Sequence, residues 1–119
     1  MGRKLRSETG MTLELKTVAA PRIPVRYYEG GTGTPLVFLH GAGGVLPGDP
    51  LLEKLSQKYH LYAPLLPGYG DSEECGEIRD MLDFALHTAD VIDALGLKDP
   101  ILVGHSMGGM IAAEMAAIA

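Results

Sequence analysis

Short apolar runs that alternate with helical segments constrain the fold of this 119-residue chain more than any other feature. Residues 36–39 are apolar at every position, and residues 59–65 and 100–104 form similar strand-like runs, each followed by a segment of helical character. A strand without polar positions needs cover on both faces, as in parallel sheets whose crossover helices pack on either side. The sequence therefore predicts an α/β fold with a doubly wound, mostly parallel sheet.

The first third of the chain has a different pattern. Residues 11–18 alternate between apolar and polar side chains, and residues 23–28 follow after a proline-containing turn. This period of two predicts an antiparallel hairpin with one wet face. Residues 1–10 are basic and polar without periodicity, and we expect them to form a disordered end or a leader segment.

Two helices can be predicted before the last strand. Asp49-Pro50 provides an N-cap and a first-turn proline for residues 51–58, with Leu51, Leu52 and Leu55 as the expected buried stripe. A longer helix should end at Gly96. Its face of i, i+3, i+4 spacing is expected to contain Ile78, Met81, Leu82, Ala85, Ala89 and Ile92. His87 falls on the opposite face beside Asp83, which predicts a solvated surface pair.

Composition excludes several classes of function. The net charge is −5 and the only basic cluster is Arg3 to Arg6, so nucleic acid is not an expected partner. No apolar stretch is long enough to span a bilayer, and the lone Cys75 excludes a disulfide framework, which together predict a cytoplasmic protein without a membrane partner. The four histidines lack the spacing of a metal site, so no metal or cofactor is expected. The remaining acidic cluster should be a solvated edge, made by Asp71, Glu73, Glu74 and Glu77.

The strongest chemical signal is a G-x-S-x-G pattern over residues 104–108, centred on Ser106. It lies where an apolar strand meets a helix, which is the context that a nucleophile elbow requires. Gly104 and Gly108 would let the chain turn tightly around the serine, with His105 as a supporting residue.

An oxyanion hole would need two backbone donors. The Met107 amide would supply one, and Ala42 would supply the second from the glycine-rich loop after residues 36–39. The supporting residues of that loop would be His40, Gly41 and Gly43. A phosphate-binding loop is the alternative, but the segment lacks the lysine of a P-loop.

Three motifs in this order resemble the α/β-hydrolase superfamily. They are Phe38-Leu39-His40-Gly41, then residues 67–72 (PGYGDS), then residues 104–109 (GHSMGG). The likeness is greatest to carbon-carbon bond hydrolases, enol-lactonases and carboxylesterases. The resemblance implies that residues 11–119 are the N-terminal half of a hydrolase core domain, with Ser106 as nucleophile and a small ester-like molecule as substrate.

The sequence also departs from this family. The triad acid and histidine of such enzymes follow the elbow helix, whereas this sequence stops at Ala119 within that helix. We therefore expect weak or no activity from the chain alone. His40 and His105 flank the expected site and are the candidates for a substitute base, but the resemblance implies that each mainly packs the loop or the elbow, and His60 is expected to be a sheet residue. The alternative is a non-catalytic, self-associating module. In either case we expect a homo-oligomer, formed through the exposed edge of the Ile101 strand or by exchange of the C-terminal helix.

Overall fold

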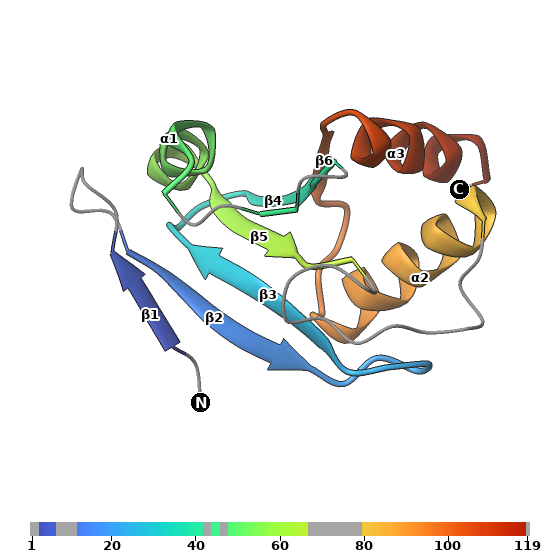
Figure 1. The fold of residues 1–119 in the computed structure, drawn as a ribbon, viewed down its shortest axis with the longest axis horizontal. Helices are drawn as coiled ribbons and strands as arrows, with labels where there is room; N and C mark the ends of the chain where they lie inside the picture. Colours follow the sequence, from blue (N-terminus) through green and yellow to red (C-terminus); the bar gives the residue numbers. More distant parts are fainter. Residues whose placement is uncertain (1–2, 7–11, 42–43, 46–47, 67–79, 119) are drawn as a thin grey trace.

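The computed structural model describes residues 3–6, 12–41, 44–45, 48–66 and 80–118, and its strands form one six-stranded sheet in the order β1-β2-β3-β5-β4-β6 (Figure 1). No helix in these ranges is long and apolar enough to cross a membrane. The elements in chain order are β1 (Arg3–Arg6), β2 (Thr12–Val18), β3 (Val25–Gly30), β4 (Pro35–Leu39), α1 (Pro50–Lys58), β5 (His60–Pro64), α2 (Met81–Ala94), β6 (Ile101–Gly104) and α3 (Met107–Ile118).

Strand β4 lies between β5 and β6 and pairs with both in parallel register. Its alternate side chains enter different cores: Leu36 and Phe38 pack with α1, whereas Val37 and Leu39 pack with α2 and α3. In Figure 1, α1 lies apart from α2 and α3, which run side by side. Cover on both faces explains why residues 36–39 contain no polar side chain. The predicted α/β fold is confirmed.

The N-terminal hairpin is also confirmed, since β2 and β3 pair antiparallel with Val18 opposite Val25. Residues 1–10 differ from expectation: Arg3–Arg6 forms β1, which pairs antiparallel with β2. A strand at the edge of a sheet needs only backbone partners, so this basic segment gave no periodic signal.

Helix α1 begins as predicted. Asp49 is the N-cap, and its side chain accepts a 2.9 Å hydrogen bond from the Leu51 amide. The predicted buried stripe is wrong at Leu51, which is 45% exposed, while Leu52 and also Glu53 are buried. Packing of α1 against the sheet buries Leu52 and leaves Leu51 exposed, and a helical wheel cannot indicate which side of an apolar stripe meets the core.

The prediction for helix α2 was correct at its end and wrong for part of its face. Gly96 adopts φ +72°, and the amides of Gly96 and Leu97 bond to the carbonyls of Asp93 and Ile92 in a Schellman arrangement. Asp83 does not pair with His87. It forms a capping box with Asp80, whose side chain accepts a 2.9 Å bond from the Asp83 amide. Ile78 lies outside the described residues.

His87 is buried at 2% exposure, whereas Leu82, expected in the apolar stripe, is 44% exposed. Helix α2 packs against α3 on one side and against the residues that join β2 to β3 on another, so its buried surface is wider than one stripe. Nδ1 of His87 is buried and has no hydrogen-bond partner among the described residues. Burial lowers the pKa of His87 from its ordinary 6.5 and the Arg22 charge lowers it too, while Asp90 opposes both.

Replacing His87 by leucine should raise the free energy of unfolding by about 1 kcal/mol at alkaline pH, because it removes a buried ring nitrogen that has no partner. His87 stays neutral in the folded state, whereas in the unfolded chain it takes up a proton near pH 6.5. Its burial therefore lowers the free energy of unfolding of the protein as the pH falls below 6.5. In His87→Leu, the free energy of unfolding should therefore fall less steeply with decreasing pH, by about 1.4 kcal/mol per pH unit below pH 6.5.

Urea unfolding at a series of pH values measures both effects. The exposed Leu86→Met change on the same helix is the control and should leave the slope unaltered. An acid slope equal in wild type and His87→Leu would contradict the burial of a neutral ring.

Candidate active site

Ser106 lies on a sharp, exposed bend between β6 and α3. Its φ is +57°, in the left-handed region that L residues other than glycine, asparagine and aspartate rarely adopt. The serine therefore belongs neither to the strand nor to the helix. Its carbonyl accepts a 3.2 Å bond from the Met110 amide, which fixes the bend at the N-terminus of α3.

Three glycines let the surrounding backbones approach this bend. A Cβ at Gly108 would overlap the carbonyl of Leu39 at the end of β4, and a Cβ at Gly104 would overlap the carbonyl of Gly108. A Cβ at Gly41 would lie 3.1 Å from both the His105 carbonyl oxygen and the Ser106 Cβ. The loop after β4 therefore runs directly against Ser106.

Hydrogen bonds hold the same junction together. The His105 amide donates to the Leu39 carbonyl at 3.0 Å, which extends the β4–β6 pairing to the residue before the serine. The Gly108 amide donates to the His105 carbonyl at 3.0 Å, closing the turn. The serine is thus held between two parallel strands and a helix start, where the helix dipole favours negative charge.

Only some of the residues predicted for the oxyanion hole and its loop lie in the described part of the chain. Ala42 and Gly43 lie outside the described residues, as do Cys75 and the acidic cluster at positions 71–77. Gly41 is buried, and its carbonyl accepts a 3.0 Å bond from the Gly44 amide. Met107 is the first residue of α3 and follows Ser106 directly. Their roles in an oxyanion hole remain predictions.

His40 is fully buried beside this loop, and both of its ring nitrogens are engaged. Nε2 accepts a 2.9 Å bond from the Leu66 amide, and Nδ1 lies 2.6 Å from the Gly41 carbonyl oxygen. Burial lowers the pKa of His40, although the Gly41 carbonyl acts in the opposite direction. A ring with both nitrogens in use cannot accept a proton from Ser106, so this geometry argues against His40 as the base.

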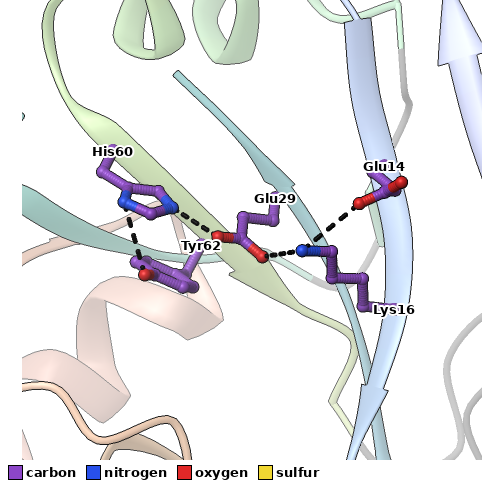
Figure 2. A network of polar contacts seen from close by, with 5 residues as sticks. All are labelled: Glu14, Lys16, Glu29, His60 and Tyr62. Carbon is purple, nitrogen blue, oxygen red and sulfur yellow. Dashed lines mark hydrogen bonds and ion pairs between the residues drawn. The ribbon is translucent and has the colours of Figure 1, made fainter. Parts of the chain in front are cut away.

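His60 lies in a second polar cluster, which Figure 2 shows on one face of the sheet. Its Nε2 contacts Glu29, which also forms a 2.8 Å ion pair with Lys16, and its ring stacks on Tyr62 at 4.4 Å between centroids. Burial raises the pKa of Glu29, but the bonds from Lys16 and His60 outweigh it and hold the pKa below its ordinary value. Hydrogen bonding to Glu29, and then to Glu14, raises the pKa of Lys16.

This cluster lies at the opposite end of the parallel strands from Ser106. His60 is in register with Pro35 at the start of β4, whereas Gly104, two residues before Ser106, is in register with Leu39 at its end. The length of β4 separates the two ends by about 13 Å. His60 therefore cannot act on the serine. Alternation along β2 and β3 was the available signal for this cluster, but the pairing register was not predictable from it.

No group of three or more histidine, cysteine or acidic side chains among the described residues could hold a metal ion. The chemistry that the geometry supports is that of a strained, exposed serine at a helix start, with a close backbone loop beside it.

Comparison with known proteins agrees with this geometry. A model of the Alpha/beta hydrolase family matches residues 36–119. The chain belongs to this family. As an α/β hydrolase it shares sequence and fold with enzymes of several activities.

Three relatives illustrate the range. The chain is 36% identical over 86 residues to (E)-2-((N-methylformamido)methylene)succinate hydrolase of Acinetobacter baylyi, an alignment that covers 71% of this α/β hydrolase and 33% of the relative. It is 37% identical to a non-heme haloperoxidase of Rhodococcus erythropolis, with 70% and 31% covered. A putative lipase from Acinetobacter baumannii superposes with a TM-score of 0.78 at 31% identity, covering 89% of this chain and 37% of that one.

The chain thus spans about a third of the length of the curated relatives it matches. The substrates named for these longer relatives are therefore not assigned to this chain.

The packing around the elbow makes a sharp prediction about two adjacent glycines. Gly108→Ala should lower the free energy of unfolding by about 3 kcal/mol, because its methyl group overlaps the backbone of β4 rather than a flexible side chain. Gly109→Ala should raise it by about 0.5–1 kcal/mol. Its methyl group meets nothing closer than 3.5 Å, and alanine is the better helix former.

Urea unfolding of the two variants beside wild type provides the test. Equal effects at positions 108 and 109 would show that β4 and α3 are not in backbone contact.

Proposed function

We propose that residues 11–119 form the N-terminal part of a serine hydrolase domain, and that Ser106 is its nucleophile. The observation that carries the proposal is the φ of +57° at an exposed serine between β6 and α3. Strain at a non-glycine residue persists only where the surrounding structure enforces it, and such residues gather at active sites. Here the enforcing contacts are those of the glycines around the bend.

The proposed reaction is acyl transfer. The Ser106 hydroxyl oxygen attacks the carbonyl carbon of an ester, a lactone or a related substrate, while its proton passes to a base. The tetrahedral oxyanion is stabilised by the Met107 amide and by Ala42, the donor implied by the family resemblance. Collapse of this intermediate breaks the bond between the acyl carbon and the leaving oxygen, and the leaving alcohol takes the proton back from the base. Water then attacks the acyl-serine, which releases the carboxylic acid and restores the Ser106 hydroxyl.

Three of the four described histidines cannot serve as a base for this serine, and the fourth, His105, is exposed directly before it. His40 has both nitrogens engaged, His60 lies at the other end of the strands, and His87 is buried in the packing of α2. Loss of the base from an intact triad costs about 10⁶ in turnover, with about 10³–10⁴ over water remaining. We therefore expect the 119-residue chain to react stoichiometrically with activated reagents and to turn over substrates slowly.

The names of related proteins support a small-molecule substrate. They include a hydrolase of a substituted succinate, a putative lipase and an N-acyl homoserine lactonase, the last with a TM-score of 0.76 at 26% identity. Ester, amide and lactone bonds share an acyl carbon that a serine can attack. This supports the reaction class and leaves the substrate's side groups open.

We also infer that copies of this chain associate through β6. Among the described strands, β6 pairs only with β4, and Ile101 on it is 40% exposed. An open apolar strand edge pairs readily with another chain. Exchange of α3 is the alternative route, and an inert module that associates in either way is the competing function.

Labelling with a fluorophosphonate reagent tests the nucleophile. Wild type should form one covalent adduct, and Ser106→Ala should form none because the attacking oxygen is gone. Ser56→Ala is the matched control, since Ser56 is buried in α1 and bonds only to the Glu53 carbonyl in its described contacts. Absence of a wild-type adduct, or equal p-nitrophenyl acetate hydrolysis by wild type and Ser106→Ala, would favour the inert module.

Light scattering at micromolar concentration tests the association. Wild type should be oligomeric and Ile101→Lys should shift toward monomer, because a charge on the edge opposes strand pairing. Leu86→Lys places the same charge at a similarly exposed site on α2 and should leave the oligomer intact. A monomeric wild type would exclude the β6 interface.

A further inference from the structure

The side chain of His105 lies exposed at the bend, directly before Ser106. Its backbone amide and carbonyl are used in the junction between β4, β6 and α3. Its ring, in contrast, forms no hydrogen bond or ion pair within the described part of the chain. Unlike the buried and fully engaged ring of His40, this imidazole is available to accept a proton.

The ring of His105 and the side chain of Ser106 lie on the same side of the bend. A Cβ at Gly41 would lie 3.2 Å from Nδ1 of His105 and 3.1 Å from Cβ of Ser106. In a regular strand, neighbouring side chains point to opposite faces. The left-handed φ of +57° at Ser106 ends this alternation directly after His105, so both side chains lie against Gly41.

These distances bring Nδ1 within reach of the serine hydroxyl. Nδ1 of His105 and Cβ of Ser106 both lie within 3.2 Å of one point, and the hydroxyl oxygen is one bond beyond that Cβ. One water molecule that hydrogen-bonds to each side over about 2.8 Å spans such an interval. Both residues are exposed, which admits this water, and a general base can act through one water.

We propose that His105 is the general base for Ser106 in this chain and that its Nδ1 takes the serine proton through one bridging water. The inference rests on the proposed function and names the base that the proposed reaction needs. In the neutral ring the proton is then on Nε2, which leaves the lone pair of Nδ1 free to accept.

Protons balance over both steps of the acyl transfer. As the serine oxygen bonds to the acyl carbon, its proton passes to the bridging water, and a proton of that water passes to Nδ1. The imidazolium returns the proton to the leaving alcohol when the bond from the acyl carbon to the leaving oxygen breaks. In the second step, the attacking water gives a proton to the same nitrogen, and the departing serine oxygen takes it back.

The expected contribution of this base is modest. General acid–base catalysis contributes about 10²–10⁴-fold, and a base is most effective when a third group orients it. No carboxylate within the described ranges bonds to the ring of His105. We therefore expect the low end of this range, about 100-fold.

Chemical rescue tests the base. During labelling by a fluorophosphonate the serine oxygen bonds to phosphorus, fluoride leaves, and the base takes the hydroxyl proton. In His105→Ala the labelling rate should fall about 100-fold and should recover when free imidazole is added, because the substitution leaves space for it. In His105→Gln the rate should fall as far without recovery, since the amide fills this space and cannot take up the proton.

His60→Ala is the matched control, because it removes an imidazole at the other end of the parallel strands. It should label at the wild-type rate with and without imidazole. Urea unfolding of all three variants shows what part of any loss comes from instability.

Two results would overturn the role of His105 alone. They are equal labelling of wild type and His105→Ala, and a slow His105→Ala that imidazole does not restore, as expected for a ring that only packs the elbow. A wild type that forms no adduct at Ser106 would overturn the proposed function and the assignment of its base together.

Discussion

The structure depends on the close approach of three backbones at one point. The start of α3 lies against the end of β4, and the end of β6 lies against α3, at distances that only glycine allows at positions 104 and 108. With the flanking chain so placed, the residue between must turn through a left-handed conformation, and that residue is Ser106. The strain at the serine is therefore a consequence of sheet-to-helix packing, and the packing energy of the whole core maintains it.

That core divides into two parts on the faces of one sheet. Leucines and aromatic residues of β4 and β5 alternate between α1 on one side and α2 with α3 on the other. Because β4 and β6 are parallel, their C-terminal ends lie side by side, and the loop after β4 meets the serine there. The Glu29–His60 cluster lies at the other end of these strands and links β2, β3 and β5 across the sheet (Figure 2). Ser106 and the Glu29–His60 cluster thus lie at opposite ends of the parallel strands.

Membership of the α/β hydrolase family agrees with this arrangement, although the chain spans about a third of the curated relatives' length. The relatives' names range from hydrolases to a haloperoxidase, so the shared part is the elbow and its sheet rather than a common substrate. The described residues contain the parts that position a serine and a neighbouring loop. They place three of the four histidines where none can take a proton from it.

The sequence by itself determined the order of strands and helices from residue 11 onward, the hairpin, the Asp49 cap, the Gly96 stop and the bend at Ser106, because each depends on local periodicity or on one backbone conformation. It could not decide whether Leu51 or His87 would be buried, since that depends on which neighbours reach each helix face. The partners of His40 and His60 also came only from the tertiary structure. Sheet order and register join residues 26 to 31 positions apart, and no local pattern encodes those pairings.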